Sequence, residues 1–254
     1  MPSATRPVVL VTGAARRLGR AMALDLAAHG FDVAVHYRDS RDDAIATAAE
    51  LRPLGAAAEV FPADLSDEPA CRALVPAVAA HFGRLDAVVN SASTFEYDDA
   101  ASFGVASMEK HWRANTAPAI LLAQALHARG ETGCVVNLID QKLWNPNPDY
   151  FSYTLSKAAL QAATVMLAQA LAPRVRVCDV APDVTLVSGP MNADEFAAAH
   201  RMTPLQRSST PDDIARAVRF LIESPAITGT TLLVDGGQHL SAQPRDVLHL
   251  AKNT

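Results

Sequence analysis

The sequence has few cysteines and little net charge, and each shortage excludes a class of protein. It has only three cysteines, Cys71, Cys134 and Cys178, which are far apart and lack the spacing of metal ligands. We therefore expect reduced, buried thiols, with neither a disulfide framework nor a metal site. The formal net charge is only -5 over 254 residues, so the chain has no general attraction to phosphate backbones, and no nucleic acid partner is expected.

Long apolar runs are also missing. The N-terminal stretch MPSATRPVVLVTGAA has too short an apolar run for a signal peptide. The most apolar helical pattern, residues 158–172, is too short and too interrupted to cross a bilayer. With no repeat, linker or low-complexity tract either, we expect a cytoplasmic protein with no membrane partner, folded as a single domain over residues 1–254.

The sequence does contain a regular alternation of short apolar runs and longer helical patterns. Runs typical of strands cover residues 7–13, 32–37, 58–65, 85–93, 133–140, 175–182 and 230–237, and helical patterns lie between them. Apolar strands separated by helices indicate a parallel sheet that is covered on both faces. The predicted fold is therefore α/β, a doubly wound parallel sheet of about seven strands.

Glycines and one irregular segment complete this outline. Gly30, Gly55, Gly83 and Gly130 fall where helices are expected to end. Residues 185–209 fit neither a strand nor a single helix, and they follow the carboxyl end of a strand. We expect them to form a loop or small helices over a site, as a substrate-loop region.

The first strand runs into a glycine turn that is typical of a nucleotide site. Thr12 and Gly13 end the strand and Gly19 opens a helix, so that backbone N–H groups and the positive end of the helix can face a pyrophosphate. The alternative is a tight strand-to-helix connection with no ligand.

The end of the second strand distinguishes the two nicotinamide dinucleotides. Arg38 and Ser40 offer a guanidinium and a hydroxyl to a 2′-phosphate, and Arg16 and Arg17 approach from the first loop, which favours NADPH over NADH. Asp39 opposes this interpretation unless it turns outward or pairs with an arginine. Polar side chains at later strand ends, Asp64 and the run from Asn90 to Ser93, would face adenine and nicotinamide, although such residues also form ordinary turns.

Tyr153 and Lys157 lie one helical turn apart on the same face of a predicted helix. The ammonium group is expected to lower the pKa of the phenol from about 10 and to prepare it for proton transfer. Asn115, in the preceding helical segment, would hold a proton-relay water. The spacing alone arises by chance in some chains, so its position behind a nucleotide turn carries the argument.

Several motifs together resemble the short-chain dehydrogenase/reductase family over nearly the whole chain. They are TGAARRLG, NSAS, Asn115, YTLSK, the stretch TPLQRSSTPDDIARAVRFL and the late TGTTLLVDGG. The resemblance implies a Rossmann-type fold, NAD(P)(H), hydride transfer and a homotetramer. Ordinary members carry a glycine where this sequence has Arg17 and a serine where it has Asp140.

The carboxylate at Asp140 changes the substrate that the pocket can accept. A serine hydroxyl donates a hydrogen bond to a ketone oxygen as negative charge develops there, whereas an ionised carboxylate donates nothing and repels that charge. A carboxylate suits a substrate with N–H donors or a ring nitrogen that needs a proton, and a reduced pterin has both. If burial raises its pKa, Asp140 can also deliver a proton.

The same two departures, with HYRDS and NSASTFEYDD, are similar to the pteridine reductase branch of the family, which includes the dihydromonapterin reductases. That resemblance implies that Arg17 bridges cofactor phosphate and pterin, that Ser93 touches both, and that Phe95 stacks on the pterin opposite the nicotinamide. The alternatives are a plain phosphate contact for Arg17 and a core position for Phe95. The full expected cofactor set is Thr12, Gly13, Arg16, Arg17, Leu18, Gly19, Tyr37, Arg38, Ser40, Asp64, Leu65, Asn90, Ser91, Ala92, Ser93, Ile139, Tyr153, Lys157, Pro182, Val184 and Thr185.

We therefore expect an enzyme that uses NADPH to reduce a 7,8-dihydropteridine, such as dihydrobiopterin, dihydromonapterin or dihydrofolate, to its tetrahydro form. Asp140, Tyr153, Lys157 and Asn115 would be catalytic, and Arg17, Ser93, Phe95, Asp140 and Tyr153 would bind the substrate. A carbonyl or 3-oxoacyl reductase of the same family is one alternative, and a non-catalytic NADPH-binding sensor or scaffold is another. The C-terminal stretch after the last strand would, in a tetramer, border a neighbour's pocket.

Overall fold

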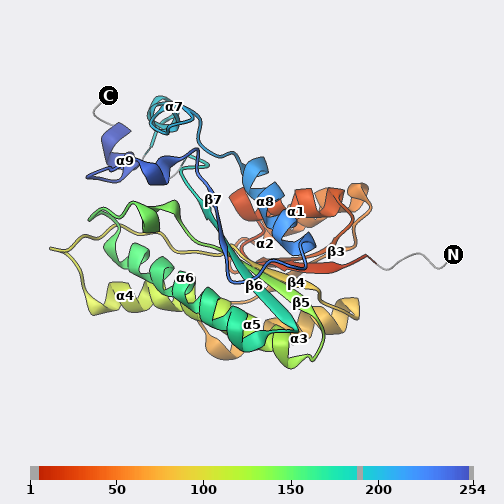
Figure 1. The fold of residues 1–254 in the computed structure, drawn as a ribbon. Coiled ribbons are helices and arrows are strands. Elements are labelled where there is room, and N and C mark those ends of the chain that lie inside the picture. Colours follow the sequence, from red (N-terminus) through yellow and green to blue (C-terminus); the bar gives the residue numbers. More distant parts are fainter. Residues whose placement is uncertain (1–5, 188–190, 252–254) are drawn as a thin grey trace.

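A parallel sheet of seven strands runs through the protein in the order β3-β2-β1-β4-β5-β6-β7, which confirms the doubly wound prediction (Figure 1). The computed structural model describes residues 6–187 and 191–251. The strands are β1 (Val8–Val11), β2 (Asp32–Tyr37), β3 (Ala58–Pro62), β4 (Ala87–Asn90), β5 (Gly133–Leu138), β6 (Val175–Pro182) and β7 (Thr231–Val234). Each adjacent pair is parallel.

Helices cover both faces of the sheet (Figure 1). One face carries α1 (Arg17–Ala28), α2 (Arg41–Leu51) and α8 (Pro211–Glu223), and the other carries α3 (Glu68–Phe82), α4 (Val105–His111), α5 (Ala117–Ala128) and α6 (Phe151–Leu171). Two short helices, α7 (Ala193–Arg201) and α9 (Val247–Leu250), lie together beyond the layers (Figure 1). No helix in the described part of the chain is long and apolar enough to cross a membrane.

The alternation of side chains along β1 shows why the strands are apolar throughout. Val9 and Val11 pack into the core on the α1, α2 and α8 side, while Val8 and Leu10 pack into the core on the α3, α5 and α6 side. All four residues are buried. Because both faces of the strand exclude water, neither set of positions tolerates a polar residue, and the two-residue polar alternation of a half-exposed strand is absent.

The expected glycine ends are confirmed where helices stop. Gly83 ends α3 with φ 76°, and Gly55 ends the short 3-10 helix Arg52–Leu54 with φ 82°. Both angles lie in the left-handed region, where glycine has no side chain to clash. At its other end α3 is capped by Asp67, whose carboxylate accepts the Ala70 N–H at 3.1 Å.

Two segments differ from a simple strand-helix alternation. The pattern around residues 108–130 is interrupted by a π-helical turn, Trp112–Thr116, between α4 and α5. Such turns are frequent at functional sites, and this one contains Asn115. The substrate-loop region 185–209 contains α7, which begins with a capping box at Asn192 and Glu195. Residues 188–190 of that region lie outside the described residues.

Candidate active site

A cleft of about 550 Å³ lies at the carboxyl ends of the strands. It is centred where β1 has β2 on one side and β4 on the other, the point at which strand order reverses. Residues at six strand ends line it: Gly13, Tyr37, Ala63, Ser91, Leu138 and Pro182. The fold therefore brings together the polar strand ends that are separate in the sequence.

Most of the predicted site residues line this cleft. They are Gly13, Arg16, Arg17, Leu18, Gly19, Tyr37, Arg38, Ser40, Asp64, Leu65, Ser91, Ala92, Ser93, Phe95, Ile139, Asp140, Tyr153, Lys157, Pro182, Val184 and Thr185. Thr12, Asn90 and Asn115 are not among the lining residues. All three are buried beneath the cleft.

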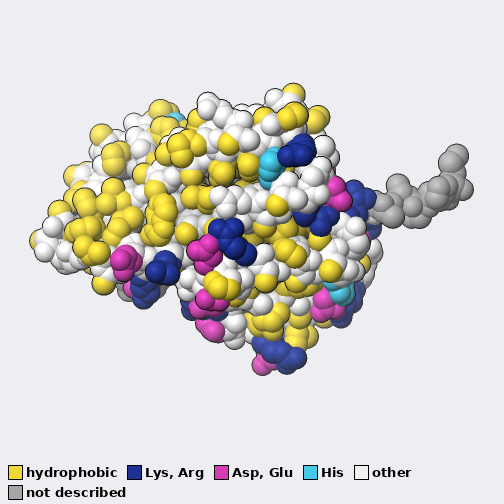
Figure 2. Space-filling view, turned by 90° about the horizontal axis from the view of Figure 1, so that it is seen from below, with side chains coloured by type: hydrophobic (Ala, Val, Ile, Leu, Met, Phe, Trp, Pro, Cys, Tyr) yellow, Lys and Arg dark blue, Asp and Glu magenta, His cyan; other side chains and the backbone are white. Residues whose placement is uncertain are grey.

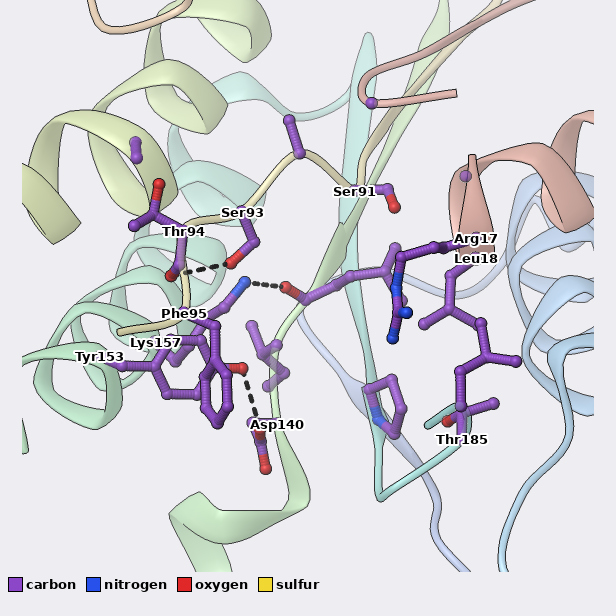
Figure 3. A pocket seen from close by; sticks show the side chains of 18 of the residues that line it. Arg17, Leu18, Ser91, Ser93, Thr94, Phe95, Asp140, Tyr153, Lys157 and Thr185 are labelled. Carbon is purple, nitrogen blue, oxygen red and sulfur yellow. Dashed lines mark hydrogen bonds between the residues drawn. The ribbon is translucent and has the colours of Figure 1, made fainter. Parts of the chain in front are cut away.

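The glycine turn after β1 is too crowded for a side chain at Gly13 or Gly19. A Cβ at Gly19 would lie 2.2 Å from the Gly13 carbonyl oxygen, and a Cβ at Gly13 would lie 3.1 Å from the Ala92 Cα. Arg17 has a left-handed φ of 53°. A left-handed non-glycine residue is strained, and such strain concentrates at functional sites. The Arg17 side chain extends into the cleft, opposite Phe95 and Asp140 (Figure 3).

Two buried polar side chains hold this turn from below. The Thr12 hydroxyl accepts N–H groups from Ser91 at 2.9 Å and Ala92 at 3.1 Å, which joins the ends of β1 and β4. The His36 Nδ1 accepts the Gly13 N–H at 3.1 Å, and its Nε2 lies 3.1 Å from the Ala63 carbonyl oxygen. Burial lowers the pKa of His36 to about 4, so the neutral ring can accept from Gly13. No role was predicted for His36, which is the first residue of HYRDS.

Charged side chains at the end of β2 lie in the open. Arg38 donates to Asp39 at 2.6 Å, and Arg16 donates to Asp43 at 2.7 Å. Asp39 therefore pairs with an arginine and does not face the cleft alone. This pairing is one of the two arrangements of Asp39 that are compatible with NADPH. Both pairs are largely exposed, so each costs little to rearrange around a phosphate.

Asp140 and Tyr153 meet at the other end of the cleft. The Tyr153 hydroxyl donates to Asp140 Oδ2 at 2.9 Å, and the Lys142 backbone N–H donates to Asp140 Oδ1 at 2.8 Å (Figure 3). Asp140 follows β5 and starts the 3-10 helix Gln141–Trp144, while Tyr153 lies in the first turn of α6. Burial raises the pKa of Asp140, against the lowering effect of these two hydrogen bonds. The carboxylate lines the cleft beside the Tyr153 hydroxyl, and its role toward a substrate stays a prediction.

The prediction that Lys157 lowers the pKa of the Tyr153 phenol is wrong in this structure. Burial and the negative charge of Asp140 raise the pKa of Tyr153 well above its ordinary value. The Lys157 ammonium donates to the Leu138 carbonyl oxygen at 2.7 Å and lies 5.7 Å from the centroid of the Tyr153 ring. Burial lowers the pKa of Lys157 itself to about 8. The phenol is thus held protonated beside an acceptor.

The side chain of Asn115 is fully used by the protein. Its oxygen accepts the Thr94 N–H at 2.7 Å and the Ser93 hydroxyl at 3.1 Å, and its nitrogen donates to the Thr94 carbonyl at 3.0 Å and to Ser156 Oγ at 3.0 Å. The side-chain amide therefore fixes the segment that carries Ser93. A proton-relay water would have to bind the main chain of Asn115 instead of its side chain. Asn90 similarly donates to Asn137 at 2.8 Å within the sheet.

An aromatic wall adjoins Tyr153. Phe95 stacks on Tyr150 with a centroid distance of 4.1 Å and an interplanar angle of 16°, and it meets Tyr153 edge-on at 4.7 Å. Phe95 is 38% exposed and lines the cleft, so it is not a core residue. Phe95 thus presents an aromatic ring to the cleft, and its stacking on a pterin stays a prediction.

The C-terminal segment closes the substrate end of its own chain's cleft. Gln238, Gln243, Asp246, Val247 and Leu248 line it, and Val247 and Leu248 pack in one apolar cluster with Tyr150 and Tyr153. The expectation that the segment borders a neighbour's pocket stays a prediction. The lining role of these residues was missed because no local motif marks them, and only folding brings them to the cleft.

Comparisons with known proteins agree with this geometry. The family described as Enoyl-(Acyl carrier protein) reductase matches residues 13–239. The solved structure of FolM Alternative dihydrofolate reductase 1 from Brucella suis, in complex with NADP, is 40% identical with a TM-score of 0.89, and the match covers 95% of this chain and 98% of that chain. Pteridine reductase 1 from Leishmania tarentolae is 34% identical over 94% of this chain and 98% of its own length. A 3-oxoacyl-acyl-carrier-protein reductase, FabG from Staphylococcus aureus strain N315, is 32% identical over 91% of this chain and 97% of its own length.

Proposed function

This chain belongs to the short-chain dehydrogenase/reductase family of oxidoreductases, and from that premise we propose that it uses NADPH to reduce a 7,8-dihydropteridine to its tetrahydro form. The observation that carries the substrate class is the Asp140 carboxylate, which accepts the Tyr153 hydroxyl at 2.9 Å. The family resemblance implies a serine at this position in ordinary members. The pteridine reductase and FolM relatives support the same class.

The residues of the cleft fit a nicotinamide dinucleotide phosphate. Gly13 and Gly19 present bare backbone at two points of the first turn, as close approach of a pyrophosphate to the backbone requires. Arg16 and Arg38 stand at the end expected for a 2′-phosphate, where guanidinium groups match phosphate geometry. A reduced nicotinamide held by these residues would supply the hydride that the carbon of a ring C=N bond needs.

The chain's own residues then handle orientation and the proton. Asp140 accepts N–H groups of the pteridine, and Phe95 offers the ring a stacking surface. The Tyr153 hydroxyl, protonated in the described geometry, donates its proton to the ring nitrogen next to the reduced carbon. Lys157 lies near the Tyr153 ring on the side of Leu138 and stabilises the phenolate that this transfer leaves behind. Water held near the Asn115 main chain would return a proton to Tyr153.

The substrate class is tested by stopped-flow oxidation of NADPH with dihydrobiopterin, dihydromonapterin and dihydrofolate beside a panel of ketones. We expect turnover with at least one dihydropteridine and slow or no turnover with ketones. Oxidation with ketones alone would reject the proposal and leave a reductase of another substrate class.

Replacement of the carboxylate gives a second test. In Asp140→Ser, turnover of the dihydropteridine should fall about 100-fold, because the acceptor for its N–H groups is lost, while ketone turnover rises or stays the same. Asp99→Ser is the matched control, since Asp99 is partly exposed and hydrogen-bonds within its own loop. The opposite order of effects in Asp140→Ser would remove our account of the carboxylate.

A carbonyl or 3-oxoacyl reductase is the second candidate. The FabG relative favours it, as does the intact pair of Tyr153 and Lys157. Against it stands the charge of Asp140, which would oppose the negative charge that develops on a ketone oxygen. The same turnover assay separates the two functions.

We also propose that the protein assembles as a homotetramer. Large apolar side chains remain exposed on α4 and α6, including Val105 at 69% and Met166 at 65%. Figure 2 shows apolar side chains gathered on part of the face below the sheet. Exposed apolar area of this kind is typical of an interface between subunits. Light scattering of the unchanged protein and of Met166→Glu tests the assembly. We expect the mass of a tetramer for the unchanged protein and a smaller mass for the variant. A monomer mass for both would reject the proposal.

A further inference from the structure

Lys142 is a buried cation that belongs to no part of the proposed chemistry. Lys142 is only 2% exposed, and such burial is rare for lysine unless its charge is paired. Its ammonium donates to Asp246 Oδ2 at 2.9 Å and to the Asp149 carbonyl oxygen at 2.6 Å, and it lies 5.4 Å from the centroid of the Tyr150 ring. Two acceptors therefore fix the ammonium group of Lys142. One of them, Asp246, is 104 positions away in the sequence.

Asp246 ties the C-terminal segment to the loop after β5. Its Oδ1 accepts the Leu248 N–H at 3.1 Å, which caps α9, and its own N–H donates to Asp149 Oδ2 at 2.8 Å. Arg245 adds a two-pronged pair with Asp149, at 2.7 Å and 2.8 Å. The Asp149 carboxylate is itself buried. Residues 245–248 are thus held against residues 140–150 by charged groups, of which Lys142 and Asp149 are buried, Asp246 is partly buried and Arg245 is exposed.

The same lysine also holds Asp140. Its backbone N–H makes the 2.8 Å hydrogen bond to Asp140 Oδ1, while the Tyr153 hydroxyl takes Oδ2. Asp140 lies past the end of β5 and before α6, so neither a strand nor an α-helix sets its orientation. The position of the Lys142 backbone, and with it the direction of the carboxylate, depends on where the Lys142 side chain is anchored.

We propose that Lys142 is a positioning residue for Asp140 and that Asp246 of the C-terminal segment is its anchor. The consequence for catalysis rests on the proposed function, because it assumes that Asp140 orients the substrate. If the anchor is lost, the 3-10 turn that starts at Asp140 loosens and the carboxylate leaves the Tyr153 hydroxyl. Loss of the Lys142 ammonium also leaves the Asp246 carboxylate without its ion-pair partner on the cleft wall. Asp140, Tyr153 and Lys157 line the same cleft, so the unpaired carboxylate repels that of Asp140.

Three variants test the anchor: Lys142→Met, Asp246→Asn and the double variant. Methionine keeps the length and apolar stem of lysine, and asparagine keeps the shape of aspartate. Lys110→Met is the matched control, because Lys110 is an exposed lysine paired with Glu96 on the surface. If Lys142→Met does not fold, Asp246→Asn carries the test alone.

The first measurement needs neither substrate nor cofactor. Hydrogen–deuterium exchange of peptides that cover residues 140–150 should speed up about tenfold in Asp246→Asn and in Lys142→Met, and stay unchanged in Lys110→Met. The double variant should exchange no faster than the worse single variant, because both changes break one contact. Unchanged exchange in both single variants would overturn the proposal.

The second measurement separates positioning from general damage. With a dihydropteridine substrate, kcat should fall about tenfold or more in each single variant, while the NADPH Kd from fluorescence changes less than about twofold. In an Asp140→Asn background, Lys142→Met should lower kcat by less than about twofold more. An equal loss in both backgrounds would contradict a role through Asp140. If the unchanged enzyme turns over no dihydropteridine, the proposed function fails, and the exchange measurement still decides the role of Lys142.

Discussion

The nucleotide end and the substrate end of the cleft are built differently. At the nucleotide end, the turn between β1 and α1 is defined by backbone shape, with glycines that admit no side chain and with charged arginines left in solvent. At the substrate end, irregular segments carry buried or partly buried charges. Lys142 pairs with Asp246, and Asp149 pairs with Arg245. Asp140 accepts hydrogen bonds from the Lys142 N–H and the Tyr153 hydroxyl.

The difference shows which force each end depends on. A nucleotide turn tolerates changes of charge but no added atom, because sterics define it. A site of buried charges tolerates neither the loss of a partner nor a large change of pH, because desolvation makes each unpaired group costly. Mutations at the two ends should therefore fail in different ways.

The largest effect is expected at the substrate end, from removal of the Tyr153 hydroxyl. Tyr153→Phe lacks the proton donor and should lower kcat by about 1,000-fold with little change in NADPH affinity. Steady-state kinetics and cofactor titration measure the two quantities. Tyr97→Phe is the control, since Tyr97 is 49% exposed, and it should keep kcat within about twofold. A kcat of Tyr153→Phe close to that of the unchanged enzyme would mean that another group delivers the proton.

At the nucleotide end, a substitution that adds atoms should be destabilising for steric reasons. Gly19→Ala places a methyl group where the Gly13 carbonyl oxygen lies only 2.2 Å away, so the turn must open at a cost of more than about 2 kcal/mol. Urea unfolding measures the loss, and NADPH binding should weaken with it. Gly104→Ala, whose added methyl meets nothing within 4 Å, should cost about 1 kcal/mol or less, because Gly104 is the N-cap of α4 and alanine is a poorer N-cap. Equal losses in the two variants would contradict the steric account.

A buried carboxylate below the substrate end should make stability depend on pH. Burial raises the pKa of Asp179 to about 7 from an ordinary value of 3.8, although Thr164, Asn137 and Thr231 donate to it. The folded state then binds a proton more tightly than the unfolded state, so this contribution is present below pH 3.8 and is lost as pH rises through 7.

Asp179→Asn removes that dependence. Between pH 5.5 and pH 8.5 the unchanged protein should lose about 2 kcal/mol of its free energy of unfolding through this group, and the variant should not. Urea unfolding at both values measures the difference. Asp42→Asn, at an exposed helix start, is the control and should retain the pH dependence. A variant that loses stability between the two pH values as the unchanged protein does would assign the effect to other groups.

The smallest effect is expected for an exposed charge at the nucleotide end. Arg38→Gln should weaken NADPH binding about tenfold and leave NADH binding unchanged, because only the 2′-phosphate is contacted. The effect should shrink at high salt, since the group is in solvent. Titration with both cofactors at two salt concentrations measures it, with Arg72→Gln as a distant control. If NADH binding weakens as much as NADPH binding, Arg38 does not contact the 2′-phosphate alone, and this account of Arg38 is wrong.

The sequence by itself determined the layered architecture and most of the nucleotide end. Apolar runs such as 32–37 and 175–182 coincide with β2 and β6, because a strand buried on both faces needs an uninterrupted apolar pattern. Gly13, Gly19, Tyr153 and Lys157 could be found because short-range spacing dictates their geometry. The carboxylate at Asp140 was also visible, since its neighbour Tyr153 lies on the next element of the chain.

Only the tertiary structure decided how the substrate end is closed and how its charges behave. Lys142 and Asp246 are 104 positions apart, and nothing in either local sequence indicates a pair. The direction of the Tyr153 pKa shift was wrong for the same reason: helical spacing placed Lys157 near the phenol, but burial and Asp140 dominate the shift. Desolvation depends on everything that surrounds a group, and that environment exists only after distant segments have packed together.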